Sequence, residues 1–154
     1  MLDADWGFRT HQILGDHMTA FVGPESTTEK ADLQLHVVVQ HFNITPSEGI
    51  HRLYLLQYIL KSWVDPALEI QNGQLTFAGL TLTTTQMRHH AHSTTFHVGL
   101  FIDPEQLGKP SIGLDELDVA CKPLAFDVMH AYRHNIAEIV RTTTTSRSPQ
   151  VTLA

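Results

Sequence analysis

The chain has 154 residues, 42% of them hydrophobic, which is the size and composition of one ordinary globular domain. Ten Lys+Arg residues against sixteen Asp+Glu residues give a formal charge of −6, which argues against nucleic acid and anionic membrane surfaces as partners. The single cysteine excludes an intrachain disulfide, and no apolar run in the sequence is long enough for a membrane span.

The first predicted element is a helix over residues 5–22, with Asp5 as its N-cap and Gly23 and Pro24 after its end. Side chains at helical spacing on one face are Ile13, Leu14, His17, Met18 and Phe21. Because His17 falls inside this apolar stripe, we predict a packed core histidine there and not a metal ligand. A polar connector is expected at 23–30.

A central strand and a capped helix are predicted next. Apolar and polar residues alternate over 33–44, and the second face is also partly apolar, which is typical of a central strand. Thr45, Pro46 and Glu48 match a capping box at the start of a helix that runs to about Trp63. The residues predicted to face the sheet are Ile50, Leu53, Leu56, Leu60 and Trp63. Tyr54 and Tyr58 are predicted on the flank, where an interface with a partner could use them.

Three further strands are predicted between residues 68 and 102. Asn72-Gly73 favours a two-residue type I′ turn, which would place Ile70 opposite Leu75. The apolar phase changes after Phe77, and we assign this change to a β-bulge at Gly79. The histidine-rich segment then forms a turn before the last strand, at 96–102.

The C-terminal part has two helical patterns. One covers 114–128 with a break at Pro123, and the second continues to about Arg141. The tail 142–154 has no helical period and is rich in threonine, so we predict an extended arm. Val151 and Leu153 are then alternate side chains that enter pockets at a sheet edge, which we assign to a neighbouring subunit.

These elements predict a single α+β domain over 1–141, followed by the C-terminal arm 142–154. Its sheet is expected to be largely antiparallel, with about four strands, and its helices to pack on one side. The predicted core includes Leu53, Leu56, Val37, Phe96 and Leu100.

Histidine occurs 11 times and suggests two possible metal sites. His90 and His92 would point to one side of an extended segment, and with His97 they could bind zinc or another transition metal. His130 and His134 are one helical turn apart, near Asp127. The opposing interpretation is that residues 89–92 are a solvated turn, and that the helical histidines pair with Asp127 and Glu138.

No nucleotide-binding, nucleophile-elbow or thiol motif is present in the sequence, which favours a non-enzymatic protein. We therefore predict an interaction or assembly subunit, for example a viral or phage structural or assembly component, that forms homo-oligomers through its apolar helix and C-terminal arm. The expected partners are further copies of the chain or other proteins, with no cofactor. The alternative is a metal-dependent enzyme or metal-binding module using histidines of 89–97.

The absence of a basic, apolar N-terminal signal pattern predicts a location in the cytoplasm, or in a complex or virion assembled there. A histidine-rich interface would also make assembly depend on pH between about 8 and 5.

Overall fold

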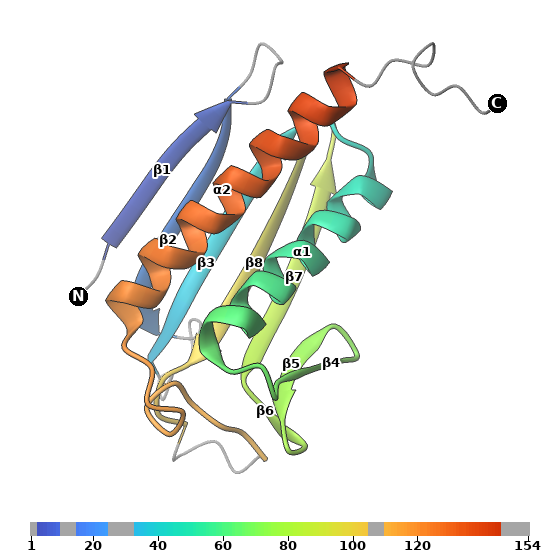
Figure 1. Cartoon of the computed structure of the whole chain (residues 1–154). Coiled ribbons are helices and arrows are strands. Elements are labelled where there is room, and N and C mark those ends of the chain that lie inside the picture. Colours follow the sequence, from blue (N-terminus) through green and yellow to red (C-terminus); the bar gives the residue numbers. More distant parts are fainter. Residues whose placement is uncertain (1–2, 10–14, 25–32, 105–109, 146–154) are drawn as a thin grey trace, which may run out of the picture.

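The computed structural model of the chain describes residues 3–9, 15–24, 33–104 and 110–145. These residues form a five-stranded antiparallel sheet in the order β1-β2-β3-β8-β7, a three-stranded sheet in the order β4-β5-β6, and two helices (Figure 1). The elements in chain order are β1 (Asp3–Arg9), β2 (Gly15–Pro24), β3 (Leu33–Phe42), α1 (Pro46–Val64), β4 (Glu69–Gln71), β5 (Gln74–Phe77), β6 (Leu80–Thr81), β7 (Thr83–His90), β8 (Ser93–Phe101) and α2 (Cys121–Thr145). The predicted α+β class is confirmed, with five strands in the main sheet instead of about four.

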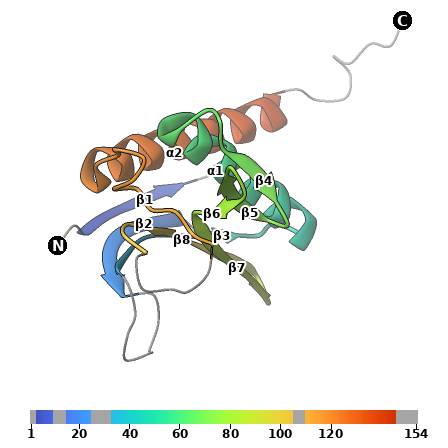
Figure 2. The ribbon, with the colours of Figure 1, turned by 90° about the horizontal axis from the view of Figure 1, so that it is seen from below.

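Both helices lie on the same face of the five-stranded sheet, as Figures 1 and 2 show together. The small sheet lies beside α1 and the β7 edge, and β5 contacts β7. β3 is the middle strand, as its two partly apolar faces predicted, and it pairs with β2 and β8. The opposite face of the sheet is covered by neither α1 nor α2 (Figure 2).

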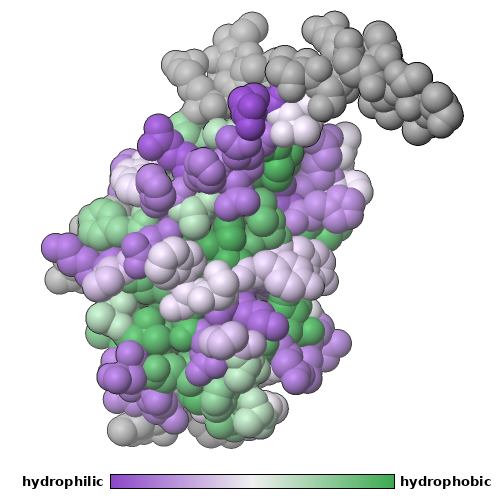
Figure 3. All heavy atoms as spheres, in the orientation of Figure 1, coloured by the Kyte–Doolittle hydropathy of each residue, from purple (hydrophilic) through white to green (hydrophobic). Residues whose placement is uncertain are grey.

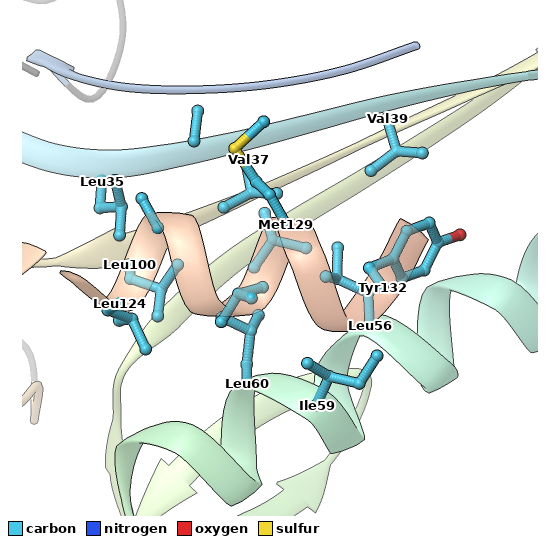
Figure 4. Packing of buried hydrophobic residues seen from close by; sticks show 14 of the residues in the cluster. Leu35, Val37, Val39, Leu56, Ile59, Leu60, Leu100, Leu124, Met129 and Tyr132 are labelled. Carbon is cyan, nitrogen blue, oxygen red and sulfur yellow. The ribbon is translucent and has the colours of Figure 1, made fainter. Parts of the chain in front are cut away.

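The core lies between the sheet and the two helices (Figure 4). Alternate side chains of β3 point toward the helices, where they meet residues of α1 and α2. Fully or almost fully buried members of this layer include Leu35, Val37, Val39, Leu56, Leu60, Phe96, Leu100, Met129 and Tyr132. Four of the five predicted core residues are therefore buried, while Leu53 is only partly buried.

The capping box at Thr45 is confirmed, because the Thr45 hydroxyl accepts from the Glu48 N–H and the Glu48 carboxylate accepts from the Thr45 N–H. The predicted buried face of α1 is wrong in part, since Ile50 is 44% exposed and Trp63 is 49% exposed. The reason is the close approach of α1 to β8 at Gly49. A Cβ at Gly49 would lie 2.7 Å from Cγ2 of Thr94, which turns the neighbouring Ile50 outward.

The predicted helix over 5–22 is wrong. Its described parts are two antiparallel strands, β1 and β2, in which Trp6 pairs with Met18. Met18 and Ala20 alternate along β2 and are fully buried under α2, whereas the side chain of His17 is 48% exposed. Strand pairing onto β3 therefore overrides the helical spacing, and His17 is not a core histidine.

The β4–β5 hairpin is confirmed. Asn72 and Gly73 have φ of 52° and 76°, as a type I′ turn requires, and Ile70 pairs with Leu75. The predicted bulge at Gly79 is instead a second tight turn. Ala78 and Gly79 both have positive φ, and the chain reverses there into β6.

The first C-terminal helix predicted at 114–128 is wrong in its N-terminal half, where residues 114–118 form turns and Leu114 is buried in the core. One long helix, α2, begins at Cys121 and continues to Thr145, so the first four residues of the predicted arm are helical. Residues 146–154 lie outside the described residues. Neither described helix has the length and apolar character needed to cross a membrane.

Candidate functional site on the open face of the sheet

A buried polar network joins the sheet to both helices. His41 Nδ1 lies 2.9 Å from Oδ2 of Asp16, and its Nε2 lies 2.6 Å from the hydroxyl of Tyr132 on α2. The Phe42 N–H donates to the other oxygen of Asp16, at 3.0 Å. Arg52 of α1 places its guanidinium 3.1 Å from His41 Nδ1. Asp16, His41 and Tyr132 are nearly or fully buried.

The protonation of this network follows from burial. Desolvation lowers the pKa of His41, Asp16 opposes this effect, and the positive charge of Arg52 adds to it. Burial also raises the pKa of the Tyr132 phenol well above its ordinary value. A neutral His41 can donate from Nδ1 to Asp16 and accept from Tyr132 at Nε2, and the donor-only guanidinium of Arg52 is then a charged neighbour of Nδ1 and not its hydrogen-bond partner. The network therefore acts as a tie between layers.

An open depression lies beside this network, lined by Gly7, Phe8, Gly15, Asp16, His17 and Arg133. Both carboxylate oxygens of Asp16 already accept hydrogen bonds from His41 and Phe42. Arg133 extends over the ring of Trp6, with its guanidinium carbon 6.0 Å from the ring centroid. Because its main polar groups are engaged, we assign this region a structural role.

The second cluster lies on the face of the sheet that the helices leave open. The strand register places Phe21, His36 and Gly99 in one row across β2, β3 and β8, and Gln34 one row away. His36 Nδ1 lies 2.7 Å from Nε2 of His97. The rings of Phe21 and His36 stack, with centroids 4.9 Å apart and planes within 24°.

The partners of His36 determine the tautomers of the pair. Its Nε2 lies 2.9 Å from the carbonyl oxygen of Pro24 and 3.3 Å from that of Gly23, so it must carry the N–H. A neutral His36 then accepts at Nδ1, and His97 donates from Nε2, which leaves Nδ1 of His97 as an acceptor. Burial, followed by the neighbouring His36, lowers the pKa of His97 and favours this neutral form.

Gln34 is the most unusual residue of the open face. It has no exposed surface, and neither its amide oxygen nor its amide nitrogen has a hydrogen-bond partner. Its amide oxygen and the hydroxyl of Thr84 occupy the space where a side chain at Gly99 would begin, so that position requires glycine. Gln57, the other buried glutamine among the described residues, donates to the Gly73 carbonyl and leaves only its oxygen unpaired.

We call this cluster the Gln34 patch and define it as Gln34, His36, Thr84, His97 and Gly99. A buried amide with both ends unpaired is rare in native proteins, because each unpaired group costs about 1–3 kcal/mol. The patch therefore holds an unpaired donor and an unpaired acceptor that have no exposed surface, and the acceptor of His97 lies on the same strand face as Gly99. A polar molecule can pair with this amide only if the groups that cover Gln34 move aside.

The structure separates most of the histidines that the sequence suggested as metal ligands. His90 ends β7, Ala91 with φ of 51° begins the turn, and exposed His92 follows, so these two do not share an extended segment. His97 instead pairs with His36. His130 contacts the Trp6 ring and His134 is exposed on α2. The described residues contain no group of three or more ligand side chains suited to a metal, and metal binding stays a prediction.

The predicted interface residues are only partly described. Tyr54 is 39% exposed and Tyr58 is 60% exposed on the outer side of α1, as the sequence indicated. Val151 and Leu153 lie outside the described residues. The sequence reading missed Gln34, His36, Asp16 and His41. Alternation along β3 could have placed Gln34 and His36 on one face, but not their partners on β8 and β2.

Comparison with known proteins gives a likeness in structure only. No protein-family model matches the sequence, and no curated protein sequence matches it significantly. A protein of unknown function from Pyrococcus horikoshi superposes with a TM-score of 0.70 and 19% identity, over 88% of this chain and 82% of that one. Biotin protein ligase from Leishmania major in complex with biotin has a TM-score of 0.55 and 10% identity, over 89% of this chain and 74% of that one.

LipL1 from P. falciparum, in complex with lipoate, has a TM-score of 0.54 and 13% identity, over 69% of this chain and 35% of its own length. The chain shares its fold with these proteins. At identities of 10–19% the likeness extends to the fold alone. In this chain, one face of the main sheet is packed against the two helices, and neither helix covers the other face.

Proposed function

We propose that this domain binds a small organic molecule on the open face of its five-stranded sheet, at the Gln34 patch. The observation that carries the proposal is the fully buried amide of Gln34, with neither end hydrogen-bonded. A bound ligand that pairs with the amide removes an unfavourable term from the folded state, and that gain contributes to its affinity. The His36–His97 pair is a further polar group beside it.

The fold likeness supports the choice of first ligands to test. Two of the similar structures have biotin or lipoate bound, which are small organic acids. Small-molecule sites commonly combine a mostly apolar surface with a few polar groups, and the Gln34 patch has Phe21 and Phe101 beside its polar residues. We propose binding without catalysis, because the sequence carries no motif for nucleophilic or phosphoryl-transfer chemistry.

Nitrogen-15 NMR titration of the protein with biotin, and separately with lipoate, tests the proposal. We expect signals from the open-face residues of β3 and β8 to shift, while signals from α1 and α2 stay in place. The Gln34→Leu variant should lose the shifts, and the Gln40→Leu variant is the matched control, because Gln40 lies on the same strand face but outside the patch. Shifts confined to the helix side, or none with either ligand, would refute the proposal.

A second candidate function is assembly through α1, and the exposure of its outer side favours it. Ile50, Tyr54 and Tyr58 follow one another at intervals of four residues, so they lie along one side of α1. Each is between 39% and 60% exposed. Figure 3 shows the helix side of the molecule, where hydrophobic residues remain at the surface among polar ones. An exposed apolar ridge on a helix is a common docking element.

Sedimentation of the wild type and a Tyr54→Ser, Tyr58→Ser double variant tests this second candidate. We expect an oligomer for the wild type and a monomer for the variant with unchanged thermal stability, since both side chains are exposed. The Leu33→Ser variant is a control, because Leu33 is 54% exposed but lies at the end of β3. A monomeric wild type at high concentration would contradict assembly through α1.

A further inference from the structure

A groove on the helix side of the molecule lies between the end of α1 and the start of α2, which Figure 1 shows next to each other. Its volume is about 370 Å³, near the small end of the range for ligand sites. Residues of α1, of the turn before α2 and of the first two turns of α2 line it. We call it the Trp63 groove and define it by Trp63, Val64, Leu117, Asp118, Leu124 and Asp127.

The inner part of the Trp63 groove is apolar. Leu124 is 3% exposed and belongs to the hydrophobic core, and Val64 and Leu117 pack against that core. Trp63 is 49% exposed, so about half of its surface is open to a partner. Tryptophan is over-represented among the residues that contribute most to protein interfaces, because its large ring loses much contact with water when a partner packs against it.

Two carboxylates, those of Asp118 and Asp127, give the groove a negative charge. Within residues 3–9, 15–24, 33–104 and 110–145, no side chain forms an ion pair or a hydrogen bond with either of them. The bordering segments 61–65 and 115–127 carry five acidic and two basic residues. The partial charges of the two helix ends oppose each other here, since α1 ends and α2 begins at the groove. The carboxylates therefore favour a positively charged group.

The backbone before α2 holds Asp118 in place. The Val119 N–H donates to the Leu114 carbonyl at 2.9 Å, and the Asp118 N–H donates to the Asp115 carbonyl at 3.2 Å, which closes the turn. Asp118 has φ of 57°, a left-handed conformation that aspartate and asparagine adopt more readily than most residues. Asp127 is carried by α2 itself. Both carboxylates thus belong to ordered backbone next to Trp63.

We propose that the Trp63 groove binds an arginine side chain of a partner protein. A guanidinium group is flat and positively charged, so it can stack on the indole of Trp63 and donate N–H bonds to a carboxylate. The aliphatic part of the side chain packs on the apolar surface of Leu117 and Leu124. Lysine carries the same charge but lacks the planar fork of donors, so arginine fits better. This groove lies on the helix side, so the inference is independent of the Gln34 patch.

Nitrogen-15 NMR titration with two short peptides tests the proposal. One is acetyl-Leu-Arg-Leu-amide, and its matched control has citrulline in place of arginine, which replaces the charged guanidinium by a neutral urea of the same length. The chain has two tryptophans, and Trp6 lies outside the groove, against Phe126 and His130. We expect the arginine peptide to shift the indole N–H signal of Trp63 and not that of Trp6. The citrulline peptide should bind about tenfold more weakly or less.

Two double variants identify the carboxylates that bind. Asp118→Asn with Asp127→Asn should weaken binding of the arginine peptide by about threefold or more, because both charges of the groove are removed. Asparagine accepts the left-handed backbone at position 118, and both side chains are exposed, so the fold is kept. Asp115→Asn with Glu116→Gln is the matched control, since it removes the same charge from the same turn but outside the groove. Its affinity should change by less than about twofold.

Four results would overturn the proposal. The arginine peptide leaves the Trp63 signal in place, or the citrulline peptide shifts it equally well. Equal weakening by the two double variants would show a general attraction of basic peptides to an acidic protein, without a specific groove. A Trp63 signal that moves on dilution of the protein alone would show that a second copy of the chain occupies the groove, and the proposed partner would be wrong.

Discussion

Replacing Gln34 by methionine is expected to stabilise the protein in the absence of ligand. Methionine is close to glutamine in length and is flexible enough to fill the same space over Gly99. The change removes both unpaired polar atoms of a side chain that has no exposed surface. Most substitutions at fully buried positions destabilise a fold, so a gain in stability here is a distinctive outcome.

The size of the effect follows from the desolvation of the amide. An unpaired buried polar group costs about 1–3 kcal/mol, and the oxygen and nitrogen belong to one amide whose desolvation is shared. We therefore expect the free energy of unfolding to rise by about 1–3 kcal/mol in total. For a domain of this size, each kcal/mol corresponds to a rise in Tm of about 2–4 °C.

Urea unfolding, followed by circular dichroism, measures the effect. Gln40→Met is the control, because Gln40 lies on the same face of β3 but is partly exposed, and its free energy of unfolding should change by less than about 0.5 kcal/mol. A loss of more than about 1 kcal/mol for Gln34→Met, with an unchanged control, would show that the amide is well hydrogen-bonded in the folded protein. The basis for a ligand at the Gln34 patch would then be gone.

Three further predictions concern the helix side. Burial lowers the pKa of His41 from 6.5 in the folded protein, so the unfolded chain binds more protons just below pH 6.5. The free energy of unfolding should therefore fall as the pH drops below 6.5. Urea unfolding across this pH range measures the change, and His41→Gln should make the free energy of unfolding depend less on pH. Leu56→Ala should lower the free energy of unfolding by about 2–5 kcal/mol in the same assay, and a loss below about 0.5 kcal/mol would contradict the observed packing. Gly49→Ala should destabilise by about 1–3 kcal/mol because the new methyl group meets Thr94, and unchanged thermal unfolding would show that α1 can move away from β8.

The parts of the fold that the sequence predicted are those set by local chemistry. The capping box at Thr45 and the Asn72-Gly73 turn each depend on a few adjacent residues, and the alternation along β3 needs no knowledge of its partners. The helix predicted at 5–22 is wrong because its apolar residues also fit a helical period. The strand alternation becomes visible only once β1 and β2 are treated as two separate, antiparallel strands.

The Gln34 patch could not be predicted for a related reason. Gln34 reads as an ordinary polar residue of an alternating strand, on the face that a half-exposed sheet would give to solvent. Its burial and its position over Gly99 depend on the register between β3 and β8, which are separated in the sequence by a helix and four strands. The histidines were noticed because of their number, but His36 acquires its role only through contact with His97.

The polar character of β7 has a consequence for how this molecule meets other chains. β7 is an outer strand of the five-stranded sheet, and its first half is joined to β5 by hydrogen bonds of Thr83 and Thr85. Its second half carries Gln86, Arg88, His89 and His90 as exposed side chains. An unpaired strand edge is a template on which a foreign strand can extend the sheet, and polar, bulky and positively charged side chains make such an edge a poor template. The order of residues along β7 thus protects the protein from fibril-like growth at that edge.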